Sequence, residues 1–375
     1  MNISFQKLFF ALATSCLVFV VLIFAKSILI PLAFALFLSF ILFPLTKRFE
    51  RWGMNDLIAA FLSIFIVFLV LSGGIYIFSA QLIGLSKELT DFQEKVLDVI
   101  ANATVYINNN INFVEDLNKD QLLEENRGWL QKTAGALAQQ TFNSTANFIT
   151  GLFATIIFTF LILIYRKGLT KGFVAFAAKE NHNRIFKMLK SIQQVGQQYL
   201  FGMILLIIII GLANSFGLMI IGVDHPFLFG FFAATLSIIP YIGTAFGAII
   251  PILYTMMAYN SFFMGVQVAI LFWAVQLITD NFLSPKIVGG SLKINALTTI
   301  LSLIIGATIW GVAGMVLFLP FAAMLKVICQ EFDTLKPIAL LIGTQDSEEE
   351  NKETFINKWK KKIAAWRKKL SKKAN

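Results

Sequence analysis

Charged side chains are scarce in this sequence. Only 14% of its 375 residues are Asp, Glu, Lys or Arg, and 57% are apolar, whereas a soluble globular domain is about 25% charged and about 45–50% apolar. The mean hydropathy is +0.76. This composition excludes a water-soluble enzyme, a secreted disulfide scaffold and a disordered regulator, and it predicts a protein whose solvent is a lipid bilayer.

Residues that commonly carry chemistry are also few. The chain has two histidines, His182 and His225, and two cysteines, Cys16 and Cys329, and the four are not clustered. A zinc site usually needs three or four close ligands, and cysteines so placed imply no disulfide framework. The sequence has no GK, HExxH or GxSxG, so it indicates neither a P-loop nor a hydrolase site. We therefore expect no metal, no cofactor and no enzymatic activity.

Long uncharged runs are what the sequence has in abundance. A bilayer core about 30 Å thick needs about 20 apolar residues as helix. The runs cover 8–25, 27–46, 57–86, 133–165, 191–223, 226–279 and 294–325. They predict an all-α, polytopic membrane protein with about eight membrane segments, of which the first is an uncleaved helix.

The charges between the runs predict an orientation. Residues 81–145 hold five basic and nine acidic side chains, whereas 166–190 hold seven basic and one acidic, and 47–56 hold three basic and two acidic. Basic loops stay on the cytoplasmic side. We therefore expect both termini, 47–56 and 166–190 inside a bacterial inner membrane, and 81–145 outside.

The second half of the chain is interrupted by glycine and proline. Each of its two runs reads as two pieces of about 13–16 residues, too short to span as helix. We predict re-entrant hairpins for the sixth and eighth segments, at 226–258 and 294–327, with full, kinked spans as the alternative. Interrupted backbone at membrane depth must face protein or a wet cavity, although glycines can also serve close helix packing. The interrupting residues are Pro240, Gly243, Gly247 and Pro251, and then Gly306, Gly311, Gly314 and Pro320.

Three stretches of this half resemble the AI-2E family of bacterial membrane transporters. They are SIIPYIGTAFGAIIPIL at 237–253, DNFLSPKIVGG at 280–290 and GATIWGVAGMVLFLPFAAMLKVI at 306–328. The chain departs from the family pattern at Thr244, where relatives often carry proline, and at Asn295-Ala296, where they often carry His-Pro. The resemblance implies an exporter or facilitator named for a quorum-sensing signal, with some members described as cation/proton antiporters. It also implies a homo-oligomer, with a pentamer as one form.

Polar residues in the apolar half are candidate transport residues. Asp280 ends an apolar helix, and it is interpreted either as an interfacial carboxylate paired with Lys286 or as an acid that couples or contacts substrate. We predict a transport path lined by 237–251, 280–290 and 306–320. Its candidate residues are Pro240, Gly243, Gly247, Pro251, Asp280, Asn281, Pro285, Lys286, Gly311, Gly314 and Pro320.

The polar segments outside the membrane are predicted to be amphipathic helices. Among basic residues, Phe173, Phe176, Ile185, Leu189, Ile192 and Tyr199 indicate an interfacial helix before the fifth span. In the C-terminal tail, apolar residues recur every three or four positions among lysines, which is typical of a helix on anionic lipid head groups; they are Phe355, Trp359, Ile363, Trp366 and Leu370. A nucleic-acid partner is not expected, because no basic reading motif is present.

The sequence thus divides into five parts and leaves three functions open. The parts are membrane segments 1–3 at 1–80, an extracytoplasmic helical segment at 81–145, segments 4–5 with a cytoplasmic basic helix at 146–225, the broken-helix transport region at 226–330, and a cytoplasmic basic tail at 331–375. The leading function is a secondary transporter or facilitator that exports small molecules. The alternatives are a cation/proton antiporter of the same fold and a membrane scaffold without transport.

Overall fold

The computed structural model describes residues 5–74, 76, 78–81, 148–239, 242–289 and 292–344, and these residues are almost entirely helical. Within them the one extended pairing is an antiparallel bridge between Ile294 and Gly343. In chain order the helices are α1 (Phe5–Phe24), α2 (Lys26–Arg51), Asp56–Gln81, Phe148–Ala175, η1 (Lys179–Asn181), α5 (His182–Ile221), α6 (Pro226–Leu236), α7 (Ile242–Ala258), α8 (Phe262–Ile278), η2 (Thr279–Leu283), η3 (Pro285–Gly289), α10 (Ala296–Trp310), α11 (Val312–Glu331), η4 (Asp333–Leu335) and α12 (Lys336–Ile342).

Six helices of the described residues are long and apolar enough to cross a membrane: Lys26–Arg51, Asp56–Gln81, Phe148–Ala175, Lys179–Ile221, Phe262–Val288 and Val312–Glu331. Shorter apolar helices cover Leu12–Phe24, Pro226–Leu236, Phe246–Ala258 and Ala296–Trp310. The all-α, polytopic class is therefore confirmed. The count of about eight membrane segments stays a prediction, because length alone does not tell which short helices enter the bilayer.

Large apolar side chains cover the outside of these helices. Phe24 is 83% exposed and Ile220 is 87% exposed, and many phenylalanines, leucines and isoleucines of the long helices are exposed to a smaller extent. A soluble monomer rarely shows continuous apolar surface on this scale. These faces are accounted for if hydrocarbon replaces water around the helices.

Three helices of the first half form one cluster. Leu42 of α2, Ala60 of Asp56–Gln81 and Leu163 of Phe148–Ala175 are buried against one another. Two ion pairs join their ends, one between Arg166 and Glu50 and one between Lys167 and Asp56, whose Nζ and Oδ2 are 2.9 Å apart. Residues 47–56 and the beginning of 166–190 therefore meet at one end of this cluster, as the charge pattern requires if both are on one side of a membrane.

The broken second half folds into two helical hairpins. In the first, α6 and α7 pack so closely that a Cβ on Gly247 would lie 2.9 Å from the Ala233 Cα, and one on Gly243 would collide with the Leu236 carbonyl. In the second, α10 and α11 meet at Gly306 and Gly314. Gly311 separates these two helices with φ of +61°, a conformation that glycine adopts at little cost. Whether the hairpins re-enter the membrane stays a prediction.

The prolines that we expected to hold the breaks do not all do so. Pro251 and Pro320 lie inside α7 and α11, both buried, and each helix continues past its proline. The breaks fall instead at the turn beginning at Ser237 and at Gly311. A proline inside a helix removes one backbone hydrogen bond and clashes with the preceding turn, but tight packing on neighbouring helices can hold it in place.

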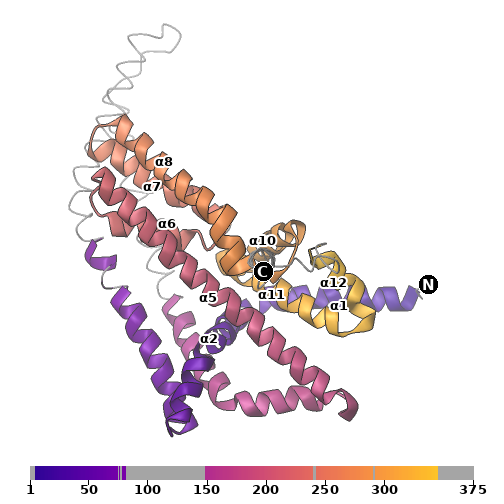
Figure 1. Cartoon of the computed structure of the whole chain (residues 1–375). Helices are drawn as coiled ribbons and strands as arrows, with labels where there is room; N and C mark the ends of the chain where they lie inside the picture. The colour runs from indigo at the N-terminus through magenta and orange to yellow at the C-terminus, as the bar shows by residue number, and fades with distance from the viewer. Residues whose placement is uncertain are drawn as a thin grey trace, which may run out of the picture.

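The longest described helix, α5, contacts helices from both halves of the chain. Its 40 residues correspond to about 60 Å at 1.5 Å per residue, twice a bilayer core. The predicted interfacial helix and the fifth span are thus one continuous helix from His182. Phe173 lies before a turn at 176–178, and Phe176 lies within that turn. Figure 1 shows α5 and α8 running side by side along the molecule, with α6 and α7 beside their upper ends and α10–α12 near the opposite end of α8.

Candidate functional site

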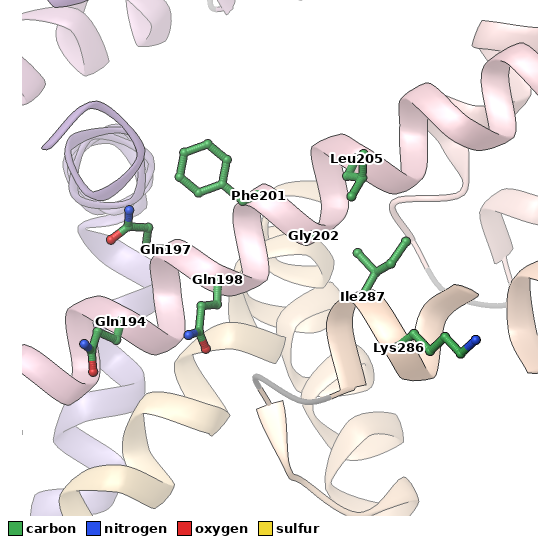
Figure 2. A pocket seen from close by; sticks show the side chains of 8 residues that line it. All are labelled: Gln194, Gln197, Gln198, Phe201, Gly202, Leu205, Lys286 and Ile287. Atoms are coloured by element: carbon green, nitrogen blue, oxygen red, sulfur yellow. The ribbon is translucent and has the colours of Figure 1, made fainter. Parts of the chain in front are cut away.

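An open cavity of about 800 Å³ lies between the polar half of α5 and the segment η3 (Figure 2), and most of its lining residues are exposed. Sites for small molecules commonly measure about 300–1,000 Å³. The lining residues are Gln194, Gln197, Gln198, Phe201, Gly202 and Leu205 from α5, and Lys286 and Ile287 from η3. The cavity therefore has two walls, one on a long straight helix and one on a short segment far away in sequence.

The α5 wall is built by helical periodicity. Steps of three and four residues bring side chains back to one face of a helix, and Gln194, Gln197 or Gln198, Phe201 and Leu205 follow that spacing. Within the described residues none of the three glutamine amides is hydrogen-bonded to another residue. Each amide offers an acceptor oxygen and two donor hydrogens, so the wall presents free hydrogen-bonding groups above an apolar strip.

The η3 wall comes close to α5 because Gly202 has no side chain. A Cβ at Gly202 would lie 3.0 Å from the Ile287 carbonyl oxygen and 3.1 Å from Val288 Cγ2. The segments η2 and η3 are both π-helical, and π-helical turns are rare and often occur at functional sites. The wide turns carry the chain from α8 to the loop before α10, so η3 is the link between the cavity and the second hairpin.

The electrostatic character of the cavity is neutral to positive. Lys286 is the one charged residue among those that line it, and no carboxylate lines it. Figure 2 shows the Lys286 side chain running along η3 with its ammonium group turned away from the glutamines. Among the described residues no group of three or more His, Cys, Asp or Glu could hold a metal ion.

The comparison with known proteins decides the family. A family model described as AI-2E family transporter matches residues 12–333. The chain belongs to the AI-2E family. It is 24% identical over 328 residues to the AI-2 transport protein TqsA of Escherichia coli (strain K12), covering 87% of this chain and 92% of TqsA. It is 26% identical over 315 residues to YrrI of Bacillus subtilis (strain 168), covering 82% and 87%, and 21% identical over 326 residues to YhhT of Escherichia coli (strain K12), covering 85% and 89%.

This AI-2E family member is accordingly a multi-pass membrane transporter, and its fold places the predicted path residues in three groups. The first hairpin holds Gly243, Gly247 and Pro251, and Pro240 lies outside the described residues. The π-helical segments hold Asp280, Asn281, Pro285 and Lys286. The second hairpin holds Gly311, Gly314 and Pro320. Of these residues only Lys286 lines the cavity.

Asp280 and Asn281 have local partners. The Asp280 carboxylate accepts a hydrogen bond of 2.8 Å from Gln276 Nε2, and Asn281 Nδ2 donates one of 2.9 Å to the Leu277 carbonyl. Both side chains are exposed, and no ion pair between Asp280 and Lys286 is present. In this family member the predicted carboxylate–ammonium pair is therefore replaced by hydrogen bonds within the helix. The extracytoplasmic segment and the basic tail, predicted at 81–145 and 331–375, fall largely outside the described residues, as does the tail helix at 353–372.

The glutamines of α5 are the site residues that the sequence analysis missed. The interfacial helix of this segment was predicted from its apolar residues, and its glutamines were not considered. The signal is visible in the sequence as two amide pairs, Gln193-Gln194 and Gln197-Gln198, one helical turn apart at the start of an apolar run. Placing clustered amides in a membrane helix costs more free energy than placing apolar side chains there. A cluster of this kind therefore indicates a polar site.

Proposed function

We propose that this AI-2E family member is a secondary transporter or facilitator that exports small polar molecules, and that the cavity between α5 and η3 binds them. The observation that carries the proposal is the set of three unpaired glutamine amides on one cavity wall. Amides can bind hydroxyl and carbonyl groups as both donors and acceptors. The printed name of TqsA supports a signal molecule, AI-2, as the first substrate to test.

The lining favours a neutral or anionic solute over a metal cation. Hard cations such as Na⁺ or Mg²⁺ are bound by several oxygen ligands, commonly including carboxylates, and the lining has none. Its single charge is the Lys286 ammonium, whose flexible four-carbon stem allows it to reorient toward a bound anion. The cation/proton antiporter remains the second candidate, with Asp280 at the adjacent η2 as its coupling acid.

We propose the orientation and the lipid partner from the basic residues at the start of α5 and in the segment just before it. Lys171, Lys179, Lys187 and Lys190 are exposed, and none forms an ion pair with another described residue. Beside them Phe176 is 93% exposed. Basic and aromatic side chains on one surface bind anionic lipid head groups. We infer a cytoplasmic location for this end, which labelling of these lysines only from the inner side of sealed vesicles would support. A homo-oligomer, with a pentamer as the first form to test, is proposed on the family resemblance.

The test uses the full chain in liposomes, with AI-2 efflux and Na⁺ exchange against a proton gradient as readouts. Gln198→Ala removes hydrogen bonds worth about 1 kcal/mol, so we expect AI-2 flux to fall about fivefold. Gln193→Ala changes the neighbouring amide, which does not line the cavity, and flux should stay within twofold of the unchanged protein.

Two results would reject the proposal. Equal flux through both variants would place the binding site elsewhere. Proton-coupled Na⁺ exchange without AI-2 flux, abolished by Asp280→Asn, would establish the antiporter instead.

A further inference from the structure

Three segments of the chain meet where α12 ends. The loop before α10 pairs with the end of α12 through the Ile294–Gly343 bridge, and the backbone N–H of Asn295 donates a 3.0 Å hydrogen bond to the Ile342 carbonyl. Lys326 of α11 reaches the same place, where its ammonium group donates to the Lys293 carbonyl. We call this meeting point, formed by 293–295, Lys326 and 341–344, the C-terminal junction.

Asn295 binds both sides of the C-terminal junction. Its Oδ1 accepts a 2.8 Å hydrogen bond from the Thr298 N–H, which caps the start of α10. Its Nδ2 donates to the carbonyls of Leu341, at 2.7 Å, and Gly343, at 3.0 Å. The last carbonyls of a helix lack partners within the helix, so one side chain satisfies the beginning of α10 and the end of α12 together.

Lys326 is unusual for a charged residue. It is only 9% exposed, and no carboxylate of the described residues forms an ion pair with it. A buried charge is costly unless it is hydrogen-bonded. The Lys326 ammonium group donates to the Lys293 carbonyl in the loop before α10. The C-terminal end of α12 lies beside it, because a Cβ on Gly343 would be 3.1 Å from Lys326 Nζ, and helix C-termini carry partial negative charge. Lys293, which supplies this carbonyl, has φ of +47°, a strained value for a residue other than glycine.

The C-terminal junction and the cavity share one hydrophobic cluster. Ile294 of the junction and Ile287 of the cavity wall both pack against the cluster that contains Tyr199 and Val288. Tyr199 is 1% exposed and Val288 is 8% exposed, so the cluster is well closed. Any shift of the loop at 292–295 must therefore be accommodated by η3 or by this cluster, because packed cores do not deform continuously.

We propose that Lys326 and Asn295 are positioning residues for transport. By closing the C-terminal junction they fix the loop at 292–295 and hold η3 against α5, so that the cavity keeps its second wall. The junction stays closed throughout the transport cycle. The inference rests on the cavity function proposed above, but its first test measures the wall itself and needs no transported substrate.

The first test measures whether η3 leaves α5. In a chain with Cys16→Ser and Cys329→Ala, a single cysteine replaces Val288, and the probe is a water-soluble maleimide. Lys326→Met should raise the labelling rate of this buried cysteine at least fivefold. Lys326→Arg keeps the cation, and the rate should stay within twofold. A single cysteine at Val268, which is fully buried on α8, is the matched control and should not respond to Lys326→Met.

A disulfide across the junction gives the second test. Cysteines replacing Ile294 and Gly343 occupy bridge partners. A Cβ on Gly343 would lie 3.0 Å from the Ala339 carbonyl oxygen and 3.1 Å from the flexible end of Lys326. In the Lys326→Met chain we expect AI-2 flux to fall, because the cavity loses its second wall. Oxidation should return Val288→Cys labelling to its slow rate and restore this flux in liposomes. In the chain with Lys326 present, oxidation should leave flux unchanged.

Other outcomes would contradict either the positioning role of Lys326 or the proposed substrate. Equal acceleration at 288 and 268 would mean general loosening and would overturn the positioning role, as would no acceleration at either site. Flux that stops on oxidation and returns on reduction would show that the junction opens during transport, which also contradicts the proposal. If the unchanged protein moves no AI-2, the proposed substrate fails, while the labelling result still decides the role of Lys326.

Discussion

Gly202 is the residue on which the two-walled cavity depends most directly. It lies on α5 opposite Ile287 and Val288, and the space beside its Cα is too small for a side chain without movement of η3. The neighbouring glutamines supply polar groups, but they line a cavity only because the second wall stands this close. A glycine in a helix interior costs about 1 kcal/mol relative to alanine, and close approach of η3 is a physical reason to keep it.

We predict that Gly202→Leu displaces η3 and lowers AI-2 flux in liposomes at least tenfold. The leucine must push against the Ile287 carbonyl, a backbone atom that cannot rotate away. Gly168→Leu is the control, because nothing lies within 4 Å of a Cβ at that position, and its flux should match the unchanged protein. Normal flux through Gly202→Leu would show that η3 is not a wall of the transport site.

Some features of the helices are predictable from the sequence and others are not. Uncharged runs predict the long helices well, because a bilayer imposes length and apolarity directly on the chain. The glycines predict the hairpin contacts, since Gly306 and Gly314 meet as close packing requires. The sequence does not tell that Pro251 and Pro320 sit inside continuous helices, because neighbouring helices decide whether a proline breaks or is held.

The cavity was predicted only in part for a related reason. Lys286 could be singled out, because a charged residue next to an apolar run is visible in sequence. The glutamines on α5 become a site only when η3 packs opposite them, and this pairing joins residues more than 80 positions apart. The same holds for the C-terminal junction, where Lys326 meets a loop and a helix end that local patterns do not connect.

At the scale of elements, we predict that Gly314→Ala destabilises the second hairpin. Its Cβ would collide with the backbone carbonyl of Gly306, and overpacking of this kind commonly costs about 1–3 kcal/mol. The measurement is thermal unfolding of the purified protein in detergent, where the midpoint should fall. Gly151→Ala is the matched change in open space, and helix propensity predicts a midpoint equal to or above the original. Equal midpoints for the two variants would contradict the close contact.

The described residues combine an apolar exterior with a glutamine-lined cavity on the half of α5 that also carries its basic residues. The net charge of +10 is concentrated at the ends of the first-half cluster, near the start of α5 and in the tail. Among the described residues, ion pairs use Arg166, Lys167, Arg184 and Lys336, which leaves other lysines for lipid head groups. The cavity therefore lies next to the end of the molecule that we place in the cytoplasm, where a solute for export would enter.

The most direct test of the account blocks the cavity in a working protein. A single cysteine replaces Phe201, which lines the cavity and carries no amide, in the chain with Cys16→Ser and Cys329→Ala. AI-2 efflux from liposomes is measured before and after complete modification with a bulky, water-soluble maleimide. The same modification at a cysteine replacing Gln193 is the control. We expect flux to stop after modification at 201 and to continue after modification at 193. Full flux through protein that is completely modified at 201 would show that the solute does not pass through this cavity.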